Sequence, residues 1–388
     1  MNNFIYDVPT KVYFGENAVD NLSAELKKYG KKVLLCYGSG SIKKSGLYDK
    51  VTEQIKEASL ELFELSGIAP NPRVDSVREG AKICKENGID VVLGVGGGST
   101  LDCTKWIAAA AKAEHDAWDF FSKWVEVKDA LPVLTVLTLS ATGSEMNCGG
   151  VISNPKTKDK IGRLDRKLLP KASFLDPTLT YSVSAYQTAC GSADIISHIL
   201  EVYFSPTKDM YMLDSIMESL LKTVIRFAPI AIQKPDDYEA RANLMWASSW
   251  AINGFIKAGK THEWSCHPME HELSAIYDIT HGLGLAILTP RFLRYCLNEH
   301  NVDKYVSLGV NVFDIDKNLD KMDIANKAID KLSEFFFDTL GLDDTFTKVG
   351  IKSEDYAIMA KKACEDGTLH GFVDLNAEDI VNIFKMCE

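Results

Sequence analysis

The chain has 388 residues, enough for two domains of the usual size of about 100–200 residues each. Its residues are 46% hydrophobic and 25% charged, which excludes an intrinsically disordered protein. The formal net charge of -11, without a run of basic residues, argues against a nucleic-acid partner. No signal sequence opens the chain, no stretch approaches the roughly 18 apolar residues of a membrane span, and the nine cysteines are scattered without a CxxC pair. We therefore expect a cytoplasmic protein that does not enter a membrane.

The first half alternates β-branched runs with amphipathic helical stretches, the pattern of a parallel sheet covered by helices. Strands are predicted at 32–38, 90–95 and 132–139, with helices at 16–30 and 101–113. Each strand runs into a loop rich in Gly, Ser and Thr. Because the carboxyl ends of parallel strands share one edge, these loops should form a ligand-binding edge.

The second half is helical. After residues 176–183 the strand signal stops, and Ser184 with Gln187 forms a Ser-x-x-Gln capping box for a helix. The sequence thus predicts an α/β domain at 1–182 and a helical domain at 183–388, packed closely with a cleft between them.

The segment 94–99 is a Gly-rich turn between a strand and a helix, so its backbone N–H groups could hold a pyrophosphate. Its three consecutive glycines are not the Rossmann fingerprint, and Ser99 with Asp102 makes a helix-start signal, so a tight turn before a capped helix explains it equally well. The similar loops 38–41 and 140–145 favour a dinucleotide. Asp102 would repel phosphates and could simply cap its helix.

Four of the eight histidines fall in two short segments that also hold an aspartate. Asp194 and His198 are four residues apart, so they share a helix face, and His267, His271 and His281 follow downstream. Imidazoles and one carboxylate suit a divalent cation, and Fe²⁺ and Zn²⁺ both fit. Since three protein ligands suffice for a catalytic ion, spacing alone leaves open which of the three downstream histidines is not a ligand.

Several motifs in the same order resemble the iron-containing, or group III, alcohol dehydrogenases. They are GGGSTLDCTK (96–105), LSATGSE (139–145), GSADIISHILEVYF (191–204) and HPMEHELSAIYDITHG (267–282). Within that family the chain most resembles the butanol dehydrogenases, through DVPTKVYFG (7–15), LDPT (175–178) and KPDDYEARANLMWASS (234–249). The match spans nearly the whole chain.

The resemblance implies a dehydroquinate synthase-like architecture: an N-terminal α/β dinucleotide-binding domain with a parallel sheet and an all-α C-terminal metal-binding domain. The implied metal ligands are Asp194, His198, His267 and His281. His271 is implied to move a proton at the reacting oxygen. The implied cofactor contacts are Gly38, Ser39, Gly96, Gly97, Gly98, Ser99, Asp102, Thr138, Thr142, Asn147 and Lys160.

The implied activity is the interconversion of short-chain primary alcohols and aldehydes, of the butanol and butanal type, with NAD(H) or NADP(H) and Fe²⁺ or Zn²⁺. A dehydroquinate-synthase-type lyase that uses NAD transiently and a catalytically silent nucleotide- and metal-binding protein are the alternatives. No acidic side chain occurs in the loop 37–44 to repel a 2′-phosphate, so both coenzymes should be accepted. Residues 4–15 read as an exposed β-ribbon whose pairing predicts a homodimer, which the resemblance also implies.

Overall fold

The computed structural model describes residues 1–365 and 367–388. The chain divides into two compact units. One contains residues 7–183 and 235–249, and the other contains residues 1–6, 184–234 and 250–388. The sequence predicts a domain boundary between residues 182 and 183, and the two compact units divide one residue later, between 183 and 184. The domain boundary stays a prediction. We refer to the α/β unit and the helical unit.

The α/β unit is built on a six-stranded sheet in which all neighbouring strands are parallel. The strand order is β1-β8-β5-β4-β2-β3. The strands are β1 (Lys11–Phe14), β2 (Lys32–Tyr37), β3 (Glu61–Leu65), β4 (Val91–Gly96), β5 (Val133–Leu137) and β8 (Ala172–Leu175). An antiparallel hairpin of β6 (Gly149–Asn154) and β7 (Asp159–Leu164) forms a second, small sheet.

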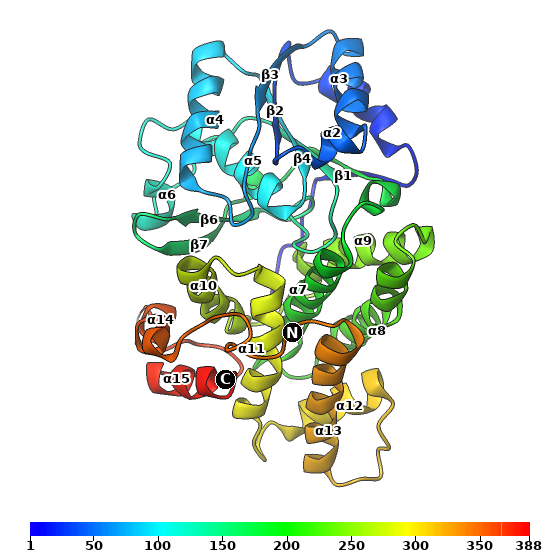
Figure 1. Ribbon diagram of the computed structural model, residues 1–388, viewed down its shortest axis with the longest axis vertical. Coiled ribbons are helices and arrows are strands. Elements are labelled where there is room, and N and C mark those ends of the chain that lie inside the picture. The colour runs from blue at the N-terminus through cyan, green and yellow to red at the C-terminus, as the bar shows by residue number, and fades with distance from the viewer. Residues whose placement is uncertain (366) are drawn as a thin grey trace. The chain divides into compact units, whose positions relative to one another are not determined.

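Helices cover both faces of the large sheet. The helices of this unit are α1 (Leu22–Leu26), α2 (Ser41–Lys44), α3 (Leu47–Glu57), α4 (Val74–Asn87), α5 (Gly98–Ala110), α6 (Asp119–Ser122) and most of α9 (Tyr238–Ile252). Because side chains alternate along a strand, Leu34 of β2 packs in one core with α4 and α5, whereas Leu35 packs in the other with α1 and α3. Figure 1 shows α3 and α4 on opposite sides of the strands.

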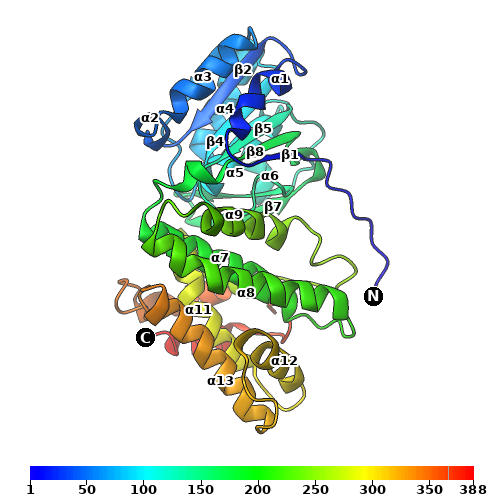
Figure 2. The same cartoon turned by 90° about the vertical axis from the view of Figure 1, so that its right-hand side faces the viewer.

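The remaining long helices form the helical unit, where α7 and α8 run side by side (Figure 2). They are α7 (Ala185–Tyr203), α8 (Tyr211–Gln233), α10 (Cys266–Tyr277), α11 (His281–Cys296), α12 (Val302–Phe313), α13 (Lys321–Glu334), α14 (Tyr356–Ala363) and α15 (Ala377–Lys385). The hydroxyl of Ser184 accepts a hydrogen bond from the Gln187 N–H, as the sequence predicts for the start of α7.

The predicted fold class is confirmed, and so are the three predicted strands within two residues at each end. The predicted helix at 16–30 is wrong: it is a short 3₁₀ turn followed by the five-residue α1, because Asn17 adopts a left-handed conformation and Gly30 has a φ of 139°. Of the expected ribbon at 4–15, only Lys11–Phe14 is a strand, paired with β8 at one edge of the large sheet. Strands β3, β6, β7 and β8 were not predicted.

Two expectations drawn from composition can be compared with the structure. No helix among the described residues is long and apolar enough to cross a membrane. All nine cysteines lie in the described part of the chain and are unpaired, and eight of them are buried, whereas Cys148 is half-buried.

Candidate functional site

Three helices of the helical unit bring the four predicted metal ligands together. Asp194 and His198 lie on α7, His267 is the second residue of α10, and His281 is the first residue of α11. The Nε2 atoms of the three histidines lie 3.5, 3.8 and 3.7 Å from the Oδ1 atom of Asp194. One carboxylate oxygen is therefore surrounded by three imidazole nitrogens.

Close packing of α11 on α7 places His281 beside Asp194. A Cβ atom at Gly282 would lie 2.0 Å from the carbonyl oxygen of Cys190 in α7, so only glycine allows the two backbones this close. On α7, nearly every residue from Thr188 to Tyr203 is buried, which is why its Asp and His face the interior rather than water.

The buried polar atoms of this cluster fit a cation. Asp194 is only 2% exposed, and neither its Oδ1 atom nor Nε2 of His267 has a hydrogen-bond partner among the described residues. A buried carboxylate without a partner costs free energy, and a divalent cation would offset that cost. The donor set of three nitrogens and one oxygen suits Fe²⁺ or Zn²⁺.

Electrostatics favours the protonation states that a metal site needs at two of these residues. Burial would raise the pKa of Asp194, but His198 and the other two imidazoles outweigh it and hold that pKa well below its ordinary value. Burial lowers the pKa of His198 to about 4, although Asp194 opposes this. Asp194 is therefore ionised and His198 neutral near pH 7, as metal ligands must be.

His271 lies one helical turn beyond His267 on α10, and its ring centroid is 6.3 Å from that of His267 and 5.7 Å from that of His281. Two groups of donor atoms could each hold an ion: Asp194 with His267 and His281, and Glu270 with His271 and His281. The structure thus places His271 beside the cluster, and its role in proton transfer stays a prediction.

Two buried glutamates that the sequence analysis did not single out contact the histidines of this cluster. Glu201 accepts a hydrogen bond from Nδ1 of His267 at 2.5 Å, and Glu270 contacts Nδ1 of His281. Helical spacing in the sequence could have identified both glutamates. Glu201 lies seven residues after Asp194 on α7, and Glu270 lies three after His267 on α10, so each shares a helix face with a predicted ligand.

In the α/β unit, the Gly-rich loops follow three adjacent strands, β5, β4 and β2, and so share one edge of the sheet. Gly38 lies close to Thr100, since a Cβ atom there would be 3.9 Å from its hydroxyl. Gly98 is packed against Thr142, where a Cβ atom would lie 2.2 Å from the hydroxyl oxygen. The loops after β2 and β5 thus both lie beside the segment Gly98–Thr100 at the N-terminus of α5, where backbone N–H groups can hold phosphates.

The remaining predicted cofactor residues lie around the same edge. Ser39 follows Gly38, and Gly96, Gly97 and Ser99 surround Gly98, while the Thr138 N–H donates to the carbonyl oxygen of Gly96. Lys160 is a buried residue of β7, opposite Ser153 of β6. Their contacts with a cofactor stay predictions.

The predicted Ser-x-x-Asp helix start is wrong. Helix α5 begins at Gly98 after the N-cap Gly97, and no side chain caps it. Instead Asp102 accepts hydrogen bonds from the Ser144 hydroxyl at 2.5 Å and from the Val151 N–H at 2.9 Å. This carboxylate therefore joins α5 to the loop after β5 and to β6.

Lys105, one turn further along α5, is a buried cation that the sequence analysis did not single out. Its Nζ atom donates to the carbonyl oxygen of Ser144 at 3.0 Å and to the side-chain oxygen of Asn147 at 2.9 Å, and it lies 3.9 Å from Asp102. Asn147 in turn donates to the carbonyl oxygen of Thr142 at 3.2 Å. Asp102 and Lys105 together hold the loop that carries two predicted cofactor contacts.

The corner after β2 holds a charged group that the loop sequence alone does not show. Nζ of Lys43 lies 5.2 Å and 4.6 Å from the ring centroids of Tyr37 and Tyr48. Both tyrosine hydroxyls donate to Glu64 of β3, at 2.7 and 2.9 Å. An acidic side chain is thus present at this corner, and the tyrosines separate it from the loop.

Family models match both halves of the chain. The model described as "Iron-containing alcohol dehydrogenase" matches residues 9–177, and the one described as "Fe-containing alcohol dehydrogenase family, C-terminal" matches residues 188–387. The chain belongs to the iron-containing alcohol dehydrogenase family. Membership in this family supports alcohol and aldehyde interconversion. It argues against the two alternatives, a dehydroquinate-synthase-type lyase and a catalytically silent nucleotide- and metal-binding protein.

Individual relatives agree with this family. The chain is 50% identical to the NADH-dependent butanol dehydrogenase A of Clostridium acetobutylicum over 99% of each chain. It is 36% identical to the NADPH-dependent aldehyde reductase YqhD of Escherichia coli over 95% of this chain and 94% of that protein. The solved structure of an NADH-dependent butanol dehydrogenase A from Thermotoga maritima superposes with a TM-score of 0.95 at 37% identity, over 100% of this chain and 99% of that one. This chain and that solved structure therefore share their fold over nearly their whole lengths.

The buried contacts of Lys105 predict the effect of removing its charge. Lys105→Met keeps an apolar stem of similar length but leaves buried carbonyl groups and Asp102 without the cation, so the α/β unit should lose about 3–5 kcal/mol of stability. Thermal unfolding should start at a lower temperature, and NADH binding, measured by fluorescence titration, should weaken because the loop holding Asn147 moves.

The double variant Asp102→Asn/Lys105→Met should be less destabilised than the two single variants added together, because neither charge is then left alone. Lys82→Met removes an exposed lysine and serves as the control that should change neither property. Wild-type unfolding and NADH affinity in Lys105→Met would rule out the loop-holding role.

Proposed function

We propose that this protein reduces short-chain aldehydes such as butanal to primary alcohols, and catalyses the reverse reaction, with Fe²⁺ at Asp194, His198, His267 and His281. The observation that carries the proposal is the convergence of three imidazole nitrogens on one buried oxygen of Asp194, at 3.5–3.8 Å. Zn²⁺ fits the same donors. The relative named a butanol dehydrogenase, at 50% identity over 99% of both chains, supports the substrate class.

The dinucleotide is proposed to bind at the sheet edge described above, with its phosphates at the N-terminus of α5. Glycines at 96, 97 and 98 let the backbone approach a phosphate closely, which a side chain would prevent. NAD(H) and NADP(H) are both proposed as coenzymes, since relatives of this chain are named for each.

When bound, the iron would polarise the carbonyl oxygen of the aldehyde and the reduced nicotinamide would supply the hydride. His271 is proposed to deliver the proton to the reacting oxygen, since its ring lies beside those of His267 and His281. Trp264 packs edge-on against the rings of His198 and His267, with centroids 5.8 and 4.7 Å away. It would exclude water and contact an apolar substrate chain.

The substrate range should be broad among short aldehydes. An apolar pocket discriminates only about 1–3 kcal/mol per methylene, so several chain lengths should react. The test is steady-state oxidation of NADH by metal-loaded enzyme with a series of straight-chain aldehydes. A charged 2-hydroxy acid or a sugar that outperforms butanal would rule out this substrate class.

Removing metal ligands should separate the two binding sites. His267→Ala and His281→Ala should lose bound metal and butanal reduction yet bind NADH normally, because the dinucleotide residues lie in the other unit. His271→Ala should keep its metal and lose about 10²–10⁴ in rate, the usual contribution of a general acid. Metal content by mass spectrometry and NADH titration distinguish these outcomes. Full activity in metal-free His267→Ala would rule out the proposed centre.

The corner after β2 should control coenzyme choice. Ser39→Asp places a carboxylate where a 2′-phosphate would lie, and the resulting like-charge repulsion should raise the NADH:NADPH ratio of kcat/KM by about tenfold or more. Lys43→Met tests for an attractive interaction instead. If Lys43 binds the 2′-phosphate, this substitution should lower kcat/KM for NADPH and leave it unchanged for NADH. An unchanged ratio in Ser39→Asp would show that Ser39 is not beside the ribose.

We also propose that the protein is a homodimer in the cytoplasm. The apolar N-terminal side chains of Phe4 and Ile5 are 52% and 89% exposed, which supports burial against a second copy. The nine unpaired cysteines support a reducing compartment. Light scattering at micromolar concentration should give about twice the monomer mass, and a Phe4→Ser/Ile5→Ser variant should shift toward monomer.

A further inference from the structure

Two glutamates contact the imidazole rings of two of the proposed metal ligands. Glu201 on α7 is 6% exposed and accepts a hydrogen bond from Nδ1 of His267 at 2.5 Å. Glu270 on α10 is fully buried and contacts Nδ1 of His281. In both rings this contact is made by the nitrogen on the side away from Asp194, since Nε2 is the atom that faces that carboxylate.

We propose that Glu201 and Glu270 are positioning residues that hold these two imidazoles ready for the cation. A carboxylate on Nδ1 keeps a proton on that atom, so Nε2 is the nitrogen left to bind the metal, and the ring orientation is fixed before the ion arrives. The inference rests on the proposed metal-binding function of Asp194 and the three histidines. It adds to that function the two carboxylates that determine which nitrogen of each imidazole ring carries the proton.

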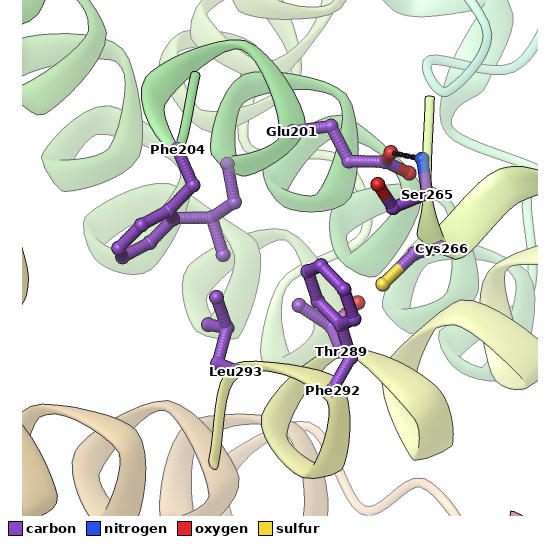
Figure 3. Close-up of a pocket in the computed structure, with 8 residues that line it drawn as sticks. Glu201, Phe204, Ser265, Cys266, Thr289, Phe292 and Leu293 are labelled. Carbon is purple, nitrogen blue, oxygen red and sulfur yellow. Dashed lines mark hydrogen bonds between the residues drawn. The ribbon is translucent and has the colours of Figure 1, made fainter. Parts of the chain in front are cut away.

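The surroundings of Glu201 keep its carboxylate in one place. It accepts hydrogen bonds from the backbone N–H of Ser265 and, at 2.9 Å, from that of His267. Glu201 also lines a cavity of about 10 Å³, together with Phe204, Phe292, Leu293 and neighbouring residues (Figure 3). The hydrogen bonds from these two backbone N–H groups therefore fix the position of the carboxylate.

Glu270 is held just as closely. It accepts a hydrogen bond from the Ser274 hydroxyl, and a Cβ atom at Gly284 of α11 would lie 2.8 Å from its side chain. Its carboxylate is in direct contact with Nδ1 of His281, which leaves no room for an ion between these two groups. Glu270 is therefore assigned to positioning rather than to ligation with His271.

His198 provides the contrast within the same cluster. Its Nδ1 atom is buried and has no hydrogen-bond partner in the described part of the chain. The ring is held by packing instead, stacked on His267 with centroids 4.7 Å apart and edge-on to Trp264 at 5.8 Å. Two of the three imidazoles are thus oriented by hydrogen bonds and the third by its neighbours.

The glutamates also change the charge balance at the cation. Asp194 alone would leave a divalent ion with a formal charge of +1. With the carboxylates of Glu201 and Glu270 the sum becomes -1, and both glutamates are buried. Electrostatic attraction is strong where the dielectric constant is low, so these outer groups should raise the affinity for the cation.

The test compares Glu201→Gln and Glu270→Gln with the wild-type protein. Each substitution removes the charge and allows the amide to present its NH₂ group to Nδ1, so the affinity for Co²⁺ should fall about 10–100-fold in competition with a chelating dye. The visible absorption spectrum of bound Co²⁺ should shift as well, because the imidazoles are less well oriented. Neither measurement depends on enzymatic activity.

Glu272→Gln is the matched control. Glu272 lies on the same helix and is 8% exposed, but its carboxylate pairs with Lys362 at 3.1 Å. Its substitution should leave the Co²⁺ affinity within about twofold of the wild type. Glu201→Asp and Glu270→Asp keep the charge on a shorter side chain, and they should fall between wild type and the Gln variants. If circular dichroism shows that a Gln variant does not fold, the Asp variant of the same residue replaces it in the test.

The outcomes separate this inference from the proposed function. Wild-type affinity in both Gln variants, with wild-type protein that does bind Co²⁺, would overturn the positioning role and leave the metal centre intact. Loss of all binding in Glu270→Gln, equal to that in His281→Ala, would make Glu270 a ligand and overturn its positioning role. Wild-type protein that binds no divalent cation would overturn the proposed function, and the inference with it.

Discussion

The structure of the helical unit depends on one electrostatic constraint, the burial of the Asp194 carboxylate. An ionised carboxylate removed from water costs several kcal/mol unless positive or hydrogen-bonding partners surround it. Here α7, α10 and α11 each supply an imidazole at 3.5–3.8 Å from one oxygen. The three helices must meet within reach of that oxygen, and Gly282 makes this possible because a side chain there would collide with the backbone of α7. The packing of these helices thus gives the geometry that the proposed metal site requires.

The edge of the α/β unit at which we propose that the dinucleotide binds, here called the dinucleotide edge, is organised differently, because the groups proposed to face the ligand are backbone atoms of loops. Loops have few contacts of their own and need support from the rigid elements beside them. Helix α5 provides it from within: Lys105 and Asp102 extend from consecutive turns and bind the loop after β5 at its carbonyl, amide and hydroxyl groups. A buried cation fixes a loop in the α/β unit, whereas buried anions contact imidazole rings in the helical unit.

Much of this arrangement could be predicted from the sequence, because its signals are local. Runs of β-branched residues predicted the central strands, and histidines at helical spacing predicted the residues that the structure brings together around Asp194. Strands β3 and β7 were missed because charged residues interrupt their apolar pattern: two of the five residues of ELFEL and three of the six residues of DKIGRL are charged. Glu201, Glu270 and Lys105 were missed for another reason. Charged residues on helices usually face solvent, and only tertiary packing shows that these three are buried against specific partners.

The distribution of thiols has a practical consequence. Burial raises the pKa of the Cys36, Cys103 and Cys266 thiols, and the reactive species of a thiol is the thiolate, so these residues should react slowly with alkylating reagents. Cys148 is the exception among the nine, half-buried and adjacent to Asn147 in the loop held by Lys105. It is a natural attachment point for a fluorophore or a spin label. The native chain thus already carries a site for a probe next to the dinucleotide edge, and no cysteine has to be introduced.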